Sequence, residues 1–132
     1  MKKSPILKFT SEAFAIAPGE DEATNPGIFG KALAEWIREQ LRASGLSTSA
    51  IVAEDFGWCV PIASAPYSLY VACGGGPSTE EWHVFAFVEG GLIHRLFGQD
   101  RSDELLATLF STLQTCLQSS SIVQGLTEEA NA

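Results

Sequence analysis

The stretch that decides the fold is YSLYVACGGGPSTEEWHVFAFVEGG, residues 67–91. In Tyr67–Cys73, bulky apolar residues occupy every second position, which is typical of a strand. In Trp82–Glu89, apolar residues occur at both odd and even positions, as in a central strand covered on both faces. Gly90-Gly91 is a two-residue hairpin signal, after which residues 92–97 read as a returning strand. The stretch therefore predicts antiparallel strands joined by short turns.

Upstream of this stretch, residues 6–16 and 51–62 have the composition of two further strands. Between them, Asn25 is a suitable N-cap and Pro26 suits a first helical position. Apolar residues then recur at helical spacing up to Gly45, which predicts a helix over residues 26–44 that packs on the sheet through Trp36.

Downstream, Asp100 or Ser102 can cap a second amphipathic helix, which the serines from Ser119 onward end. The order β-α-β-β-β-β-α predicts an α+β fold, a two-layer sandwich in which about five mostly antiparallel strands carry two helices on one face. Residues 4–119 form this single domain, and residues 120–132 read as a poorly ordered acidic tail.

Charge and cysteine content restrict the function classes. The 132 residues carry a formal net charge of −8, and the basic residues form no run. Such a field repels phosphate backbones and anionic membranes, so nucleic acid and membrane partners are not expected. Three widely spaced cysteines indicate a reducing, cytoplasmic compartment. Prolines and glycines interrupt the uncharged stretch 56–79, which excludes a spanning helix there. No cofactor motif is present, and we expect no cofactor.

Acidic residues gather at two places, Glu20-Asp21-Glu22 and Glu54-Asp55. Clustered carboxylates can bind a hard cation, but the calcium-loop pattern is absent, and neighbouring strand residues point to opposite faces. A solvated loop is the simpler interpretation, and we expect no metal. With Asp55 beside Trp58, these carboxylates instead suggest a surface that recognises another protein. For Trp58 itself, packing in the core against Trp36 is the interpretation that the large area of its side chain favours.

A cysteine nucleophile is the competing hypothesis. Cys73 precedes three glycines, whose amides could hold an oxyanion, while His83 could act as base and Asp55 as its orienter. No local pattern of a cysteine hydrolase accompanies them, and a glycine-rich turn after a buried cysteine explains the same residues. The other histidine, in His94-Arg95, lies on the returning strand, where it does not meet His83 across the hairpin.

We therefore expect a non-enzymatic protein-binding module, of adaptor or toxin-neutralising type, and keep a small hydrolase or transferase using Cys73 and His83 as the alternative. Strand parity divides the bulky residues of the sheet, so one set must turn away from the helices and form an aromatic patch. The expected occupant is either a second copy of the chain or a partner with a basic surface. The residues that parity divides are Phe56, Trp58, Tyr67, Tyr70, Trp82, Phe85 and Phe87.

Overall fold

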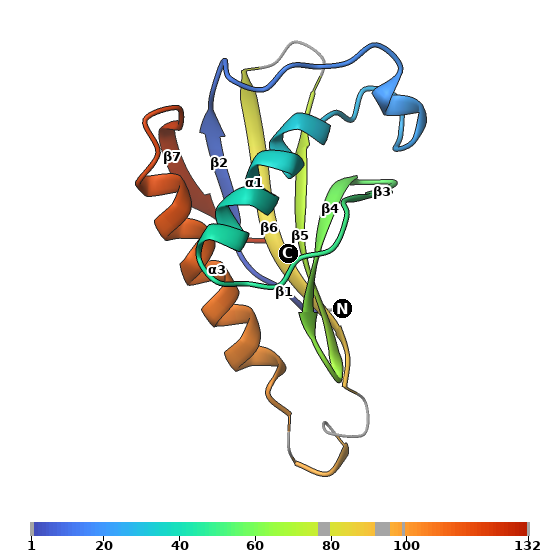
Figure 1. Cartoon of the computed structure of the whole chain (residues 1–132), viewed down its shortest axis with the longest axis vertical. Helices are drawn as coiled ribbons and strands as arrows, with labels where there is room; N and C mark the ends of the chain where they lie inside the picture. The colour runs from blue at the N-terminus through green and yellow to red at the C-terminus, as the bar shows by residue number, and fades with distance from the viewer. Residues whose placement is uncertain (1, 77–79, 92–95, 99, 132) are drawn as a thin grey trace.

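The computed structural model describes residues 2–76, 80–91, 96–98 and 100–131. It has an α+β fold, in which two long helices pack against a curled antiparallel sheet (Figure 1). The sheet order is β3-β4-β5-β6-β2-β7, and β1 also pairs with β6. The strands of the described chain are β1 Lys2–Lys3, β2 Ile6–Thr10, β3 Val52–Glu54, β4 Gly57–Ser64, β5 Tyr67–Gly75, β6 Glu81–Gly90 and β7 Gln124–Glu129.

The predicted hairpin core is confirmed. Strands β4, β5 and β6 pair in sequence order, with Val60 opposite Val71 and Val71 opposite Ala86. The segment predicted as one strand over residues 51–62 is instead a hairpin of β3 and β4, because the chain turns at Asp55 and Phe56. The first strand ends at Thr10 rather than at residue 16.

Helix α1, Lys31–Ala43, begins five residues after the predicted start at Pro26. Asn25 does not cap it: its carbonyl accepts a turn hydrogen bond from the Ile28 N–H at 2.9 Å. Apolar side chains of α1 fill the space over the sheet, and Leu33, Ile37 and Leu41 are fully buried. Trp36 lies only partly buried, with its ring 5.6 Å from that of Phe14, so the packing of the helix does not centre on Trp36.

Helix α3, Ser102–Gln118, begins where the sequence predicts. The Asp100 carboxylate accepts a hydrogen bond from the Ser102 N–H at 2.9 Å, which satisfies a free donor of the first turn. The Lys2 ammonium lies 3.2 Å from the same carboxylate and joins β1 to this helix. These interactions hold the pKa of Asp100 below its usual range, chiefly through the hydrogen bonds with Ser102.

Two predictions about the sheet edges are wrong. Strand β6 has β2 as its second neighbour, with Lys8 opposite His83, rather than a returning strand after Gly91. Of that expected strand, residues 92–95 lie outside the described residues, and Phe97 lies in a turn. The expected tail contains β7, which pairs with β2 because this side of β2 would otherwise leave its backbone groups unpaired.

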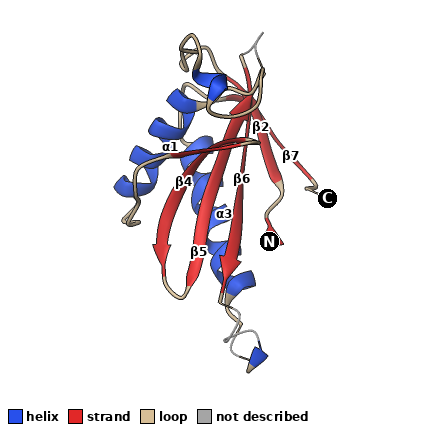
Figure 2. Ribbon diagram, turned by 90° about the vertical axis from the view of Figure 1, so that its right-hand side faces the viewer, coloured by secondary structure: helices blue, strands red, loops and turns tan. Residues whose placement is uncertain are grey.

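Both long helices lie on the same side of the sheet, as Figures 1 and 2 show. The main core fills the space between α1, α3 and that side of the strands. A second, smaller cluster of buried residues consists of Cys59, Ala72 and Phe87, with Tyr70 and Phe85 packed against it. Within the described ranges, no helix is long and apolar enough to cross a membrane.

Candidate binding face of the sheet

Strand parity gives the sheet two aromatic faces. On the inner face, toward the helices, Trp58, Tyr67 and Trp82 are 8%, 6% and 2% exposed. The Trp82 indole N–H donates to the Ser11 carbonyl at 3.1 Å, so its polar atom is satisfied inside the core. These three residues therefore belong to the structural core.

The opposite face carries a second set, which we call the outer aromatic cluster: Phe56, Tyr70, Phe85 and Phe87. Tyr70 and Phe87 stack with ring centroids 4.9 Å apart. Phe56 packs edge-on against Phe87 at 5.8 Å and lies 6.3 Å from Phe85. These spacings fall in the range of favourable aromatic pairs, so the cluster is preformed.

Exposure distinguishes the members of the outer aromatic cluster. Phe87 is 4% exposed and anchors the cluster, whereas Phe56 is 40% exposed and Tyr70 and Phe85 are half-buried. Val52, also 40% exposed, lies opposite Cys59 on the same face. An apolar surface therefore remains open to solvent on this side.

The β3–β4 turn places Phe56 over the cluster and brings Glu54 and Asp55 to its border. Gly57 follows with φ +150°, and a Cβ there would lie 2.5 Å from the Cys73 carbonyl oxygen. Because other residues do not fit, this glycine fixes the position of the turn.

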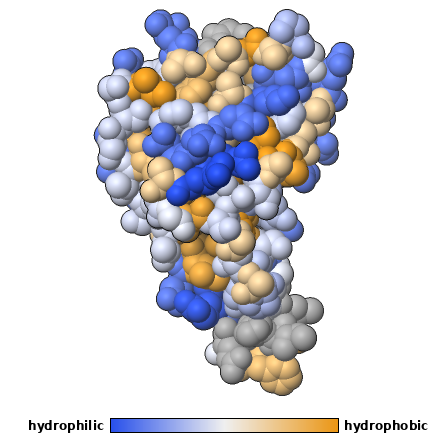
Figure 3. Space-filling view, viewed as in Figure 1, coloured by the Kyte–Doolittle hydropathy of each residue, from blue (hydrophilic) through white to orange (hydrophobic). Residues whose placement is uncertain are grey.

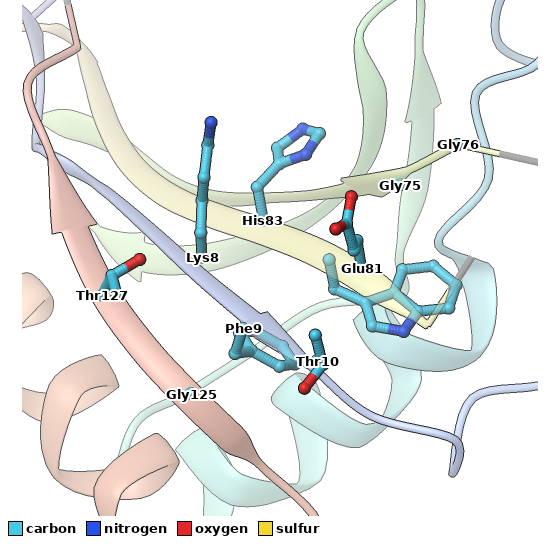
Figure 4. Close-up of a pocket in the computed structure, with 10 residues that line it drawn as sticks. Lys8, Phe9, Thr10, Gly75, Gly76, Glu81, His83, Gly125 and Thr127 are labelled. Carbon is cyan, nitrogen blue, oxygen red and sulfur yellow. The ribbon is translucent and has the colours of Figure 1, made fainter. Parts of the chain in front are cut away.

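A polar groove of about 520 Å³ adjoins the cluster between β6, β2 and β7. In Figure 4, Lys8, Glu81 and His83 project to the same side of the strands. Lys8 forms an ion pair with Glu129 at 2.9 Å. The His83 ring covers Gly74, where a Cβ would lie 2.9 Å from Nε2. Burial, and then the charge of Lys8, lower the pKa of His83, so the ring is neutral at neutral pH.

The acidic loop Glu20-Asp21-Glu22 was predicted to bind a partner, but two of its three residues form hydrogen bonds within the fold. Glu20 is buried, and its carboxylate accepts hydrogen bonds from the Gly30 and Lys31 N–H groups, both at 3.0 Å. It thereby caps α1 from a distant part of the chain. Asp21 accepts a hydrogen bond from the Gly27 N–H at 2.9 Å. Glu22 is exposed.

Trp58 and Asp55, predicted to form one recognition surface, separate. Trp58 lies in the inner core with the Lys31 ammonium 5.4 Å from its ring centroid, while Asp55 lies exposed in the β3–β4 turn. The core interpretation of Trp58 is therefore the one that its burial supports. Its indole Nε1 is buried without a hydrogen-bond partner in the described part of the chain.

The structure does not bring the proposed Cys73, His83 and Asp55 together. Gly74 is opposite His83 in the register, so Cys73, one residue earlier, points to the other face. Burial raises the pKa of the Cys73 thiol well above its usual value. Cys59 lies on the outer face, where burial and then Glu54 raise its pKa to about 12. Neither thiol is activated as a nucleophile.

Among the residues that the structure describes, no group of three or more histidine, cysteine, aspartate or glutamate residues could hold a metal ion. The pair His94-Arg95 lies outside the described residues.

The outer aromatic cluster was only partly predictable. The sequence indicated that one aromatic set must turn outward, but parity alone does not say which face the helices take. Comparisons with protein-family models, with curated proteins and with solved structures found no match for this chain.

Proposed function

We propose that this protein is a non-enzymatic binding module that receives a basic partner protein on the outer aromatic cluster. The observation that carries this proposal is the cluster itself: an ordered set of aromatic rings, partly open to solvent, on the sheet face opposite both long helices. Contiguous exposed apolar patches on soluble proteins usually mark interaction sites.

The inner core is filled without the exposed ring of Phe56. Trp58, Tyr67 and Trp82 already fill the space beneath the helices. Phe56 contributes less to the core because two-fifths of its side chain remains exposed. Aromatic residues in such positions provide large contact area at a low cost in conformational entropy, and they are enriched at interaction hot spots.

Charge around the cluster favours a basic partner. Glu54 and Asp55 border it at the β3–β4 turn, and Glu81 and Glu89 lie on the outer parity of β6, all four exposed. Two lysines share this face: Lys8 is offset by its ion pair with Glu129, and Lys3 lies opposite Phe87, so the four carboxylates still exceed the one remaining cation. A cationic surface would be steered toward this face by the local carboxylates and by the net charge of −8.

The same charges disfavour a second copy of the chain as the occupant. Twofold pairing through this face would bring two sets of these carboxylates together, each on a molecule of charge −8. A homodimer is therefore an outcome that the test must distinguish, and we expect a monomer in sedimentation equilibrium at low micromolar concentration.

The test is affinity capture from native lysate with the full-length chain and two variants. Phe56→Ser removes an exposed ring of the cluster. Phe97→Ser is the matched control, because Phe97 is 76% exposed and makes no aromatic contact with the cluster in the described ranges. We expect a basic protein to be retained by the wild type and by Phe97→Ser, and lost with Phe56→Ser.

The dependence of capture on salt concentration is a second readout of this test. An electrostatically steered complex should weaken as ionic strength rises. Equal capture by all three proteins, or capture that Phe56→Ser leaves unchanged, would contradict the proposal. A wild-type dimer that Phe56→Ser dissociates would assign the cluster to self-association instead.

A further inference from the structure

A second site lies on the helix side, at the end of α1. Arg38, Arg42 and the segment Gly45–Thr48 line a pocket of about 420 Å³. Figure 3, drawn from the helix side, shows a band of strongly hydrophilic residues across α1. In an acidic protein, two arginines one helical turn apart beside two hydroxyl residues form a local cationic site.

Two polar atoms of this pocket's residues are buried without a partner. Arg38 Nε and Thr48 Oγ1 have no hydrogen-bond partner in the part of the chain that the structure describes. No ion pair engages Arg38 within the same ranges, whereas Arg42 lies 3.3 Å from Glu39. A buried donor without a partner is costly, and such groups in a native protein call for an explanation.

The walls of the pocket are held in place. One wall is the last turns of α1. The other is the segment after it, where the Ala63 N–H donates to the Ser47 carbonyl at 2.9 Å and the Ser49 N–H donates to the Pro61 carbonyl at 3.0 Å. These bonds attach Thr48 to β4, and Gly45, with φ +91°, makes the turn between the two walls. A site on fixed elements binds without a large ordering cost.

We propose that this pocket binds a phosphate-type oxyanion through Arg38, Arg42 and Thr48. The guanidinium group presents several N–H donors in a planar fork that matches the oxygens of a phosphoryl group. The hydroxyl groups of Ser47 and Thr48 supply further donors. A bound oxyanion would pair with the Arg38 guanidinium group, which lines the pocket.

The helix C-terminus does not explain the same features. Cations are favoured near that end of a helix, which accounts for an exposed arginine such as Arg42. It does not account for Arg38, whose Nε is withdrawn from water without gaining a partner. Glu39 competes with an anion for Arg42, so Glu39→Gln should strengthen binding.

The experiment is a titration of the full chain with inorganic phosphate, followed by backbone amide NMR. We expect saturable shifts confined to Gly45–Thr48 and the last two turns of α1, which include Arg38, with sodium chloride at equal ionic strength as the control. O-phosphoserine and a nucleoside monophosphate form two further arms, which distinguish a free anion from a phosphoryl group carried on a protein or a nucleotide. Acetate tests whether a carboxylate suffices.

Variants make the assignment specific. Arg38→Gln should weaken phosphate binding about tenfold or more, and Thr48→Val should weaken it while keeping the shape of the side chain. Arg101→Gln is the matched control, because Arg101 is exposed and paired with Glu104 on α3. The absence of saturable shifts, shifts reproduced by chloride, or equal affinity in Arg38→Gln and Arg101→Gln would each overturn the proposal.

Discussion

The two faces of one sheet use aromatic residues in opposite ways. On the inner face, Trp82 is 2% exposed and has its polar atom bonded to the Ser11 carbonyl, so the ring serves the core. On the outer face, Phe56 is 40% exposed although it contacts Phe85 and Phe87. Both faces derive from alternating positions of the same strands. Aromatic content alone therefore does not reveal a binding site; incomplete burial in an ordered cluster does.

The largest expected effect is a difference in the free energy of unfolding between a variant of the inner face and a variant of the outer face. Trp82→Ala should lower the free energy of unfolding by about 3–5 kcal/mol, because it removes a fully buried large aromatic side chain. Phe56→Ser should cost about 1 kcal/mol or less, because much of the ring already contacts water. Urea denaturation measures both values. Equal costs would mean that the outer aromatic cluster is a second core rather than a surface.

A smaller effect is expected in the acidic loop. Glu20→Gln should lower stability by about 1–3 kcal/mol, because the Glu20 carboxylate accepts hydrogen bonds from the first N–H groups of α1. Glu22→Gln, at an exposed position, should stay within about 0.5 kcal/mol. The same denaturation assay compares them. If Glu20→Gln is as stable as the wild type, Glu20 does not stabilise α1, and the loop becomes a candidate partner contact again.

The smallest expected effect is a pH dependence from His83. Its pKa is lowered in the folded state, so the unfolded chain takes up a proton first as the pH falls below about 6.5. Stability from this group is therefore present above that pH and declines through the lowered pKa. His83→Gln should reduce the loss of stability between about pH 7 and about pH 5. An unchanged pH profile in this variant would place His83 in water, outside the groove.

Local signals predicted the central strands and the second helix, and tertiary contacts decided the rest. The alternation in residues 67–73 and the cap at Asp100 gave correct elements, because both signals act over a few residues. The start of α1 was misplaced because its cap, Glu20, lies ten residues before Gly30 in the chain. Strand β7 was missed because its polar sequence has no strand pattern, and pairing with β2 forms it.

The candidate sites show the same limit. Trp58 was proposed for recognition because it neighbours Asp55 in sequence, yet the turn and the pleat send them to different surroundings. Cys73 and His83 were proposed as a pair, but a register in which Gly74 is opposite His83 places them on opposite faces. Arg38 and Arg42 were visible at helical spacing, whereas Thr48 joins them only through the attachment of its segment to β4.

Site-specific photo-crosslinking tests most directly whether the outer aromatic cluster is a binding surface. A photoreactive benzoyl-phenylalanine replaces Phe56 in one full-length protein and Phe97 in another, and both are irradiated in native lysate. The account predicts a discrete product with a basic protein from position 56, reduced by added salt, and none from position 97. No product specific to position 56, or one that contains only a second copy of this chain, would contradict it.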